Sequence, residues 1–234
     1  TGNNLDTNFT INEENTLFEI SLTQYPLSSS NIRNSYSVFN TEKDLKNSFG
    51  FQSDDQGISY SVDFDYSEKI ALSSGLSYKK AKRHSAVKSS SIIDDNIGNF
   101  DIYSFNFSIR QDSTNDYLYP TDGLLNSFYV EYSPEDISDD SYYRFLLRSN
   151  VYKKLKNSNR FFFLTNRIGI ADSFDGKLKT VNAFSLGGMN FKGFDYRGIG
   201  PKQDNIYVGG NKFFTSSFGY GGSFLFDDSD NINT

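Results

Sequence analysis

The chain has 234 residues, a formal net charge of −6 and a pI near 4.8, so it lacks the basic surface that a nucleic-acid partner requires. It has no cysteine, which excludes disulfide frameworks, thiolate metal sites and a cysteine nucleophile. Hydrophobic residues make up only 36% and aromatic residues 17%, a composition typical of a protein with large rings on one face and little aliphatic core.

Alternation of apolar and polar residues begins at Phe18 and recurs along the chain. The clearest run is 58–66, where every second residue is apolar, and 70–78 repeats the pattern after a short connection, which predicts an antiparallel hairpin. Further apolar positions with this spacing are Tyr103, Phe105, Phe107, Ile109, Phe128, Val130, Tyr132, Tyr143, Phe145, Leu147, Phe162, Leu164, Ile168 and Ile170. We expect about eleven strands of the length that crosses a bilayer.

Connections of two lengths separate these strands. Short ones lie at 67–69 and 156–159, and longer polar ones at 79–99, 111–123 and 173–211. Short turns at one end and long loops at the other are typical of outer-membrane barrels. The periodicity therefore favours an all-β, antiparallel transmembrane β-barrel, although a soluble β-sandwich would use the polar faces as solvent surface and stays open. No apolar run of 18 residues predicts a transmembrane helix.

The longest connection, 173–211, carries a glycine-rich pattern that resembles the sixth extracellular loop of the BamA family. That family reads G-G-x-x-x-R-G-F, then I-G-P-[KR], then G-G-N. The matching residues are Gly187, Gly188, Phe191, Lys192, Gly193, Phe194, Ile199, Gly200, Pro201, Gly209, Gly210 and Asn211. Glycine permits positive φ and proline stiffens the chain, so this loop should be compact.

A second match is a turn about 70 residues upstream of the loop motif, which is similar to the family's F-P-T-D-G turn. Its residues are Tyr119, Pro120, Thr121, Asp122 and Gly123. All are good turn formers, and we assign them a structural role.

The resemblance covers nearly all of residues 1–234 and implies a partial outer-membrane β-barrel, from the family's third strand to just after its thirteenth. About eleven of sixteen strands would then be present, and soluble periplasmic POTRA domains would lie outside this chain. Because single-chain bacterial barrels close with an even number of strands, we expect an incomplete barrel or a strongly curved open sheet.

In the family, the loop folds into the barrel and its Arg pairs with carboxylates of the inner wall. This sequence has Lys192 at that position, which keeps the charge and loses the planar two-pronged hydrogen bond. One wall partner matches Asp227, the other position is Gly219, and Arg197 is a substitute cation. Acidic pairs such as Asp139-Asp140 lack calcium-loop spacing, so we interpret them as solvated loop charge.

The resemblance implies a bacterial outer-membrane factor that folds and inserts client barrels, without a cofactor, a metal or enzymatic activity. Its partners would be unfolded outer-membrane protein clients, lipoproteins of the assembly complex, the lipid bilayer and lipopolysaccharide. The lone His84 is a poor basis for catalysis. A TamA-like or two-partner secretion transporter shares the loop, and a passive porin would also fold loops inward; both alternatives stay open.

Overall fold

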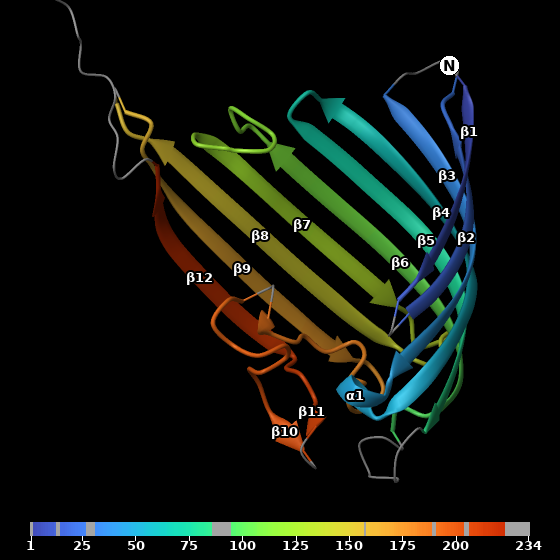
Figure 1. Ribbon diagram of the computed structural model, residues 1–234. Helices are drawn as coiled ribbons and strands as arrows, with labels where there is room; N and C mark the ends of the chain where they lie inside the picture. Colours follow the sequence, from blue (N-terminus) through green and yellow to red (C-terminus); the bar gives the residue numbers. More distant parts are fainter. Residues whose placement is uncertain are drawn as a thin grey trace, which may run out of the picture.

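The computed structural model describes residues 2–12, 15–26, 31–85, 95–156, 158–188, 191–203 and 206–222. Within these residues, ten strands form one antiparallel sheet in which β1 to β9 follow in chain order and β12 pairs with β9 (Figure 1). The strands are β1 (Asn3–Ile11), β2 (Asn15–Gln24), β3 (Ile32–Leu45), β4 (Phe51–Ser67), β5 (Ile70–Ser85), β6 (Gly98–Asp112), β7 (Gly123–Ser133), β8 (Tyr142–Lys154), β9 (Phe161–Ser173) and β12 (Lys212–Gly221).

The sheet curves strongly and stays open between its edge strands β1 and β12, as Figure 1 shows. The predicted all-β antiparallel architecture and the incomplete barrel are thus confirmed. The predicted hairpin is also present, since Ile58 pairs with Tyr78 and Phe64 with Leu72 across β4 and β5.

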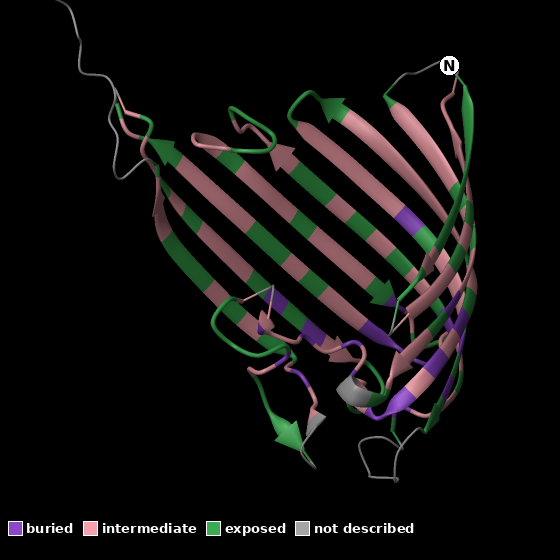
Figure 2. Ribbon diagram, viewed as in Figure 1, coloured by how far each residue is buried: buried purple, intermediate pink, exposed green. Residues whose placement is uncertain are grey.

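Two faces result from the alternation in the sequence. Along β4 the apolar Ile58 points outward and is 55% exposed, while the neighbouring Ser59 faces inward and its hydroxyl lies 2.8 Å from that of Ser37. Exposed and half-buried positions alternate in stripes along β6 to β9 (Figure 2). An apolar outer face and a polar inner face are what a barrel in lipid requires.

Two ends of the sheet differ in their connections. We call the end that carries the 134–141 and 174–211 connections the long-loop end, and the opposite end, with the 68–69 and 155–160 turns, the short-turn end. A four-residue helix, α1 (Lys46–Phe49), joins β3 to β4 at the long-loop end, where a small hairpin of β10 (Lys202–Gln203) and β11 (Ile206–Tyr207) also lies (Figure 1). No helix in the described part of the chain is long and apolar enough to span a membrane.

Two predicted connections were wrong in extent or place. Residues 79–85 continue β5, because Lys79 and Arg83 turn inward to carboxylates and so keep the alternation beyond the apolar band. The 113–122 connection lies at the short-turn end and is a compact turn. Asn115 holds it closed, because its side-chain oxygen accepts hydrogen bonds from the backbone N–H groups of Thr121 and Asp122 at 3.0 and 2.9 Å.

Few side chains of this open sheet are fully buried, and those that are gather on the concave face near the long-loop end. One cluster contains Tyr142, Ala171, Leu178 and Phe184, with Phe213 packed against it. Two of these residues belong to the 174–211 loop, so the main apolar core joins that loop to the sheet.

Close packing on the inner face generates a first prediction. A Cβ at Gly57 would lie 2.5 Å from the carbonyl oxygen of Tyr78 and 2.6 Å from the Phe39 ring. We expect Gly57→Val to destabilise the sheet by about 1–3 kcal/mol through overpacking. The midpoint of urea unfolding of the intact protein, followed by heat-modifiable gel mobility, measures this. Ser61→Val, on the same face of β4, is the control; equal midpoints for the two variants would contradict the prediction.

Candidate functional site

The loop 174–211 leaves β9 at Ser173 and folds back over the concave face of the sheet before it enters β12 (Figure 1). Isolated bridges join Phe184 to Gly210 and Leu186 to Ile199, so the two arms of the loop run antiparallel. The backbone N–H of Ala171 donates to the carbonyl of Asn211 at 2.7 Å and closes the base of the loop. The motif-bearing segment is therefore compact, as predicted from its glycines.

The first arm of the loop is anchored on the carboxylate of Asp140, which lies in the β7–β8 connection. Two cations approach this carboxylate: a guanidinium nitrogen of Arg83 on β5 lies 3.3 Å from it, and the ammonium of Lys179 in the loop lies 3.5 Å from it. The side-chain amide of Asn182 also donates a hydrogen bond to it at 3.0 Å. The Asp140 and Arg83 side chains are each only 3% exposed. Three segments that lie far apart in the sequence therefore meet at one buried carboxylate.

An aromatic ring supports both cations of this cluster. The guanidinium carbon of Arg83 lies 4.7 Å and the ammonium of Lys179 lies 5.0 Å from the centroid of Phe100 on β6. The face of an aromatic ring attracts cations, and the attraction is stronger where water is excluded. Beside the cluster, the Asn96 side chain bonds both the hydroxyl and the backbone N–H of Thr180.

Further along the loop, Phe184 inserts against the inner wall. Its ring lies 4.9 Å from that of Phe213 on β12, edge to face, and the guanidinium of Arg144 on β8 lies 4.8 Å from its centroid. Gly169 of β9 makes room for both rings, since a Cβ there would lie 2.2 Å from Phe213 and 2.8 Å from Phe184. A glycine in a strand interior often marks such a close approach.

The second arm of the loop reaches the opposite wall through Arg197. Its guanidinium carbon lies 3.7 Å from the centroid of Phe49 in α1, and one of its nitrogens donates to the Tyr207 carbonyl at 2.7 Å. Burial lowers the pKa of Arg197, and the residue adopts a φ of 57°. Because α1 joins β3 to β4, the loop spans the concave side from β9 to the far wall.

The predicted motif glycines hold the turns of this loop. Gly187 has a φ of 121°, and a Cβ there would lie 2.1 Å from the carbonyl oxygen of Asp195, so no other residue fits. Gly188 donates its backbone N–H to the Phe194 carbonyl at 2.9 Å, and the rings of Phe191 and Phe194 lie 5.6 Å apart.

The predicted cation Lys192 is exposed, and the structure gives it no ion pair within the described residues. Its predicted partner Asp227 lies outside the described residues, so their pairing stays a prediction. Gly219 lies on the inner face of β12 against Phe163, where a Cβ would meet the ring at 2.2 Å. The cations that dock the loop are the half-buried Lys179 and the buried Arg197, and the second of these was predicted as a substitute.

The interpretation of Asp140 as solvated loop charge was wrong, because its carboxylate is the hub of the buried cluster. Nothing in the local sequence separates it from its neighbour Asp139, which is exposed and bonds the backbone of Asp101. Only the placement of Arg83 and Lys179 does so.

The predicted turn of Pro120 to Gly123 lies at the short-turn end, far along the strands from the loop. Asp122 accepts a hydrogen bond from the backbone N–H of Lys154 at 3.2 Å, and this bond and the Lys153 ammonium lower the pKa of its carboxyl. Gly123 has a φ of 110°, and a Cβ there would lie 2.3 Å from the Ser113 carbonyl oxygen. These contacts support the structural role.

A sequence model described as the Omp85 superfamily domain matches residues 1–233. The fold is similar to that of BamA from Haemophilus ducreyi lacking POTRA domains 1–3, with a TM-score of 0.84 and 18% identity over 97% of this chain and 49% of that one. The chain thus spans about half the length of that structure.

A mutant ferric enterobactin receptor from Pseudomonas aeruginosa gives a TM-score of only 0.41 at 7% identity, over 92% of this chain and 35% of that one. No protein of curated function matches the sequence.

Removing the Asp140 carboxylate should release the first arm of the loop. Asp140→Ala leaves the buried Arg83 and the half-buried Lys179 without their anion, and breaking a buried pair such as Arg83–Asp140 costs about 3–5 kcal/mol. We expect faster trypsin cleavage at Lys177, Lys179 and Lys202 in the intact protein. Asp136→Ala, at an exposed position of the same connection, is the control. Equal cleavage rates in both variants would show that Asp140 does not hold the loop.

The second arm should depend on the shape of Arg197 as well as its charge. Arg197→Ala loses a cation–π contact that contributes about 0.5–2 kcal/mol, and Arg197→Lys keeps the charge without the planar fork. Hydrogen exchange of the amides in 186–199 should accelerate most in the Ala variant and less in the Lys variant. If the hydrogen-exchange rates of these amides were unchanged in Arg197→Ala, Arg197 would not be the residue that holds the second arm.

Proposed function

Because the chain belongs to the Omp85 superfamily, we propose that it is the barrel part of an assembly factor that folds and inserts client barrel proteins into the bacterial outer membrane. The outer membrane is the location of this chain, and its barrel is of the insertion or secretion type. The specific role in assembly is the step beyond that family membership.

The observation that carries the proposal is the docked loop. A loop that carries the G-G, I-G-P-K and G-G-N elements lies on the concave side of the sheet. It is fixed in three places: to Asp140 of the β7–β8 connection, to β12 through Phe184 and to α1 through Arg197. Such a brace keeps the long-loop end of the barrel in one shape. We propose that this brace lets the barrel perturb the bilayer without losing its own form.

The proposed activity lowers the barrier to client folding and makes or breaks no covalent bond, so we propose that the protein is not an enzyme. His84 points to the outer face, where its ring nitrogen lies 3.2 Å from the Gln52 side-chain oxygen. No described group of three His, Cys, Asp or Glu residues is arranged to hold a metal ion. The work we propose needs no cofactor.

Unfolded outer-membrane protein clients are the proposed substrates, and lipoproteins of the assembly complex, the bilayer and lipopolysaccharide are the proposed partners. A TamA-like factor or a two-partner secretion transporter is the alternative within the superfamily.

A conducting role, as in a passive porin, is favoured by one feature of the inner wall. Ser37, Ser59, Ser77 and Ser104 lie side by side across β3 to β6, and small hydroxyl side chains leave room for water. The same hydrated wall suits an insertase.

The proposal is tested by replacing the intact protein in cells with variants of its loop anchor. Lys179→Ala removes the half-buried cation that pairs with Asp140, and Lys177→Ala removes an exposed one two residues away. We expect the first variant to lower the levels of several unrelated outer-membrane barrels together, because a loss of about 1.4 kcal/mol shifts the equilibrium between the docked and the free loop tenfold. The second variant should leave these levels normal. If Lys179→Ala left the barrel levels normal but abolished the uptake of one solute, the insertase proposal would be wrong and a porin would be the better interpretation.

A further inference from the structure

The outer face of the sheet carries a groove of about 680 Å³ that spans β2 to β7, on the side opposite the docked loop. Its volume is within the range of pockets that bind small molecules, about 300–1,000 Å³. Side chains of Val38, Ile58 and Leu76 form its floor and are 60%, 55% and 50% exposed. The groove is therefore a preformed apolar feature of the face that the bilayer covers.

Two pairs of tyrosine rings form the walls of this groove. Tyr36 and Tyr60 lie 4.9 Å apart and Tyr78 and Tyr103 lie 4.8 Å apart, each pair directly across two strands. The Tyr60 hydroxyl donates to Asn34 toward the short-turn end, whereas the Tyr78 hydroxyl donates to Asp101 toward the long-loop end. The two pairs thus lean apart, which leaves a slot with an aliphatic floor.

A ledge closes the groove where β7 ends and β6 continues. The 134–141 connection takes the place of β7 there and bonds to β6. The backbone N–H of Tyr103 donates to the Ser138 hydroxyl at 2.8 Å, and the backbone N–H of Asp139 donates to the Asp101 carbonyl at 2.9 Å. Pro134 and Ile137 of this connection line the groove. These bonds fix the ledge before any ligand arrives.

The occupant of the slot must be a hydrocarbon chain. The strands below it are hydrogen-bonded to neighbours on both sides, so the floor offers no free backbone donor or acceptor. An extended polypeptide in the slot would leave its own N–H and C=O groups unpaired, at a cost that an acyl chain avoids. A helix would pair these groups itself, but this face of the sheet meets the bilayer, so a lipid chain is the occupant that the location supplies.

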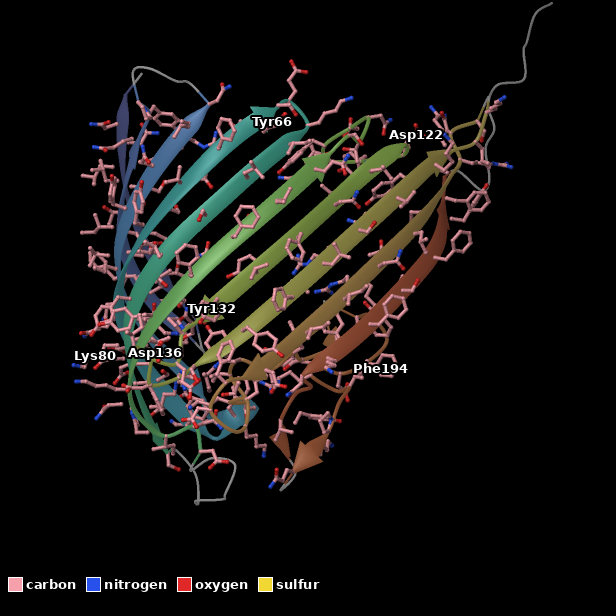
Figure 3. The ribbon with its side chains drawn as sticks, turned by 180° about the vertical axis from the view of Figure 1, so that it is seen from behind. Tyr66, Lys80, Asp122, Tyr132, Asp136 and Phe194 are labelled. Atoms are coloured by element: carbon pink, nitrogen blue, oxygen red, sulfur yellow. The ribbon has the colours of Figure 1, made fainter. Side chains whose placement is uncertain are left out.

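Cations lie just beyond the groove, toward the long-loop end. Lys80 and Lys82 follow Tyr78 on the same outward face of β5, and Figure 3 shows Lys80 at the level of Asp136. Neither ammonium belongs to an ion pair within the described residues. Both lysines share a small cavity with Glu42 and Asp54 on the neighbouring strands. Lysine is a common ligand of phosphate, and these two stand where a headgroup would meet the slot.

The orientation of the barrel in the membrane indicates which leaflet, and so which lipid, meets the groove. In outer-membrane barrels the longer loops face outward, so the long-loop end and its lysines lie at the outer leaflet. The carboxylates of Glu42 and Asp54 lie in the same cavity as the two lysines and repel a phosphate unless a divalent cation lies between them, so binding should require Mg²⁺.

We propose that this outer face binds lipid A of the outer leaflet, with one acyl chain in the slot over Ile58 and Leu76 and a phosphate against Lys80 and Lys82. The inference rests on the outer-membrane location and on the proposed partner lipopolysaccharide, for which it names the binding surface, and it does not require the insertase role.

The test is native mass spectrometry of the intact protein in phosphatidylethanolamine nanodiscs with Mg²⁺ and added lipid A. Leu76→Trp fills the slot, and Lys80→Ser with Lys82→Ser removes both cations. We expect each change to weaken lipid A retention by about tenfold or more. The controls are Leu147→Trp, on the outer face of β8, and Lys69→Ser with Lys212→Ser, which changes the net charge equally; both should retain lipid A.

Three results would overturn the proposal: unchanged lipid A retention in Leu76→Trp, unchanged retention in the double lysine variant, or equal binding of dephosphorylated lipid A. Heat-modifiable gel mobility confirms that each variant is folded before it is scored. Client barrel levels measured in the same strains test the insertase proposal separately, since lipid A retention can be lost while those levels stay normal.

Discussion

In the hydrocarbon of a bilayer no water pairs with backbone N–H and C=O groups, so a β protein must satisfy them strand to strand. The antiparallel ladder from β1 to β9 and on to β12 does this except at the open edges of β1 and β12, and it forces successive side chains onto opposite faces. One face then meets lipid and is apolar, while the other meets water and is polar. Both the outer groove and the inner anchor of the loop are consequences of this division.

On the inner face, charged side chains form a buried cluster where the loop docks. Arg83 and Asp140 are almost fully buried there, and a buried charge is tolerated only when it is paired. Lys179 and Asn182 complete the cluster from the loop, so the loop and the wall satisfy each other. The brace is built from long-range ion pairs and rings rather than from strand pairing, which allows the loop to lie across the sheet instead of joining it.

On the outer face, two pairs of tyrosine rings flank the groove, and the hydroxyls of Tyr60 and Tyr78 bond to polar residues on opposite sides. Tyrosine suits this position because its ring is apolar and its hydroxyl is polar. The tilt of the ring pairs leaves a slot that a rigid ledge closes. The apolar band on this wall is therefore more than a contact surface for bulk lipid, because its shape and the adjacent lysines distinguish one class of lipid from another.

The sequence by itself determined the strands, their two faces, the β4–β5 hairpin and the compact loop, because each depends on residues that are close in the chain: alternation with a period of two, and glycines at turns. It also determined the family, through the ordered elements of the loop. Only the tertiary structure decided that Asp140 is buried while Asp139 is exposed, that Lys179 of the loop pairs with Asp140 while Arg197 packs on Phe49, and that 113–122 lies at the short-turn end. Those facts depend on which strands the curvature of the sheet brings together, and residues 83, 140 and 179 meet through contacts that no local pattern encodes.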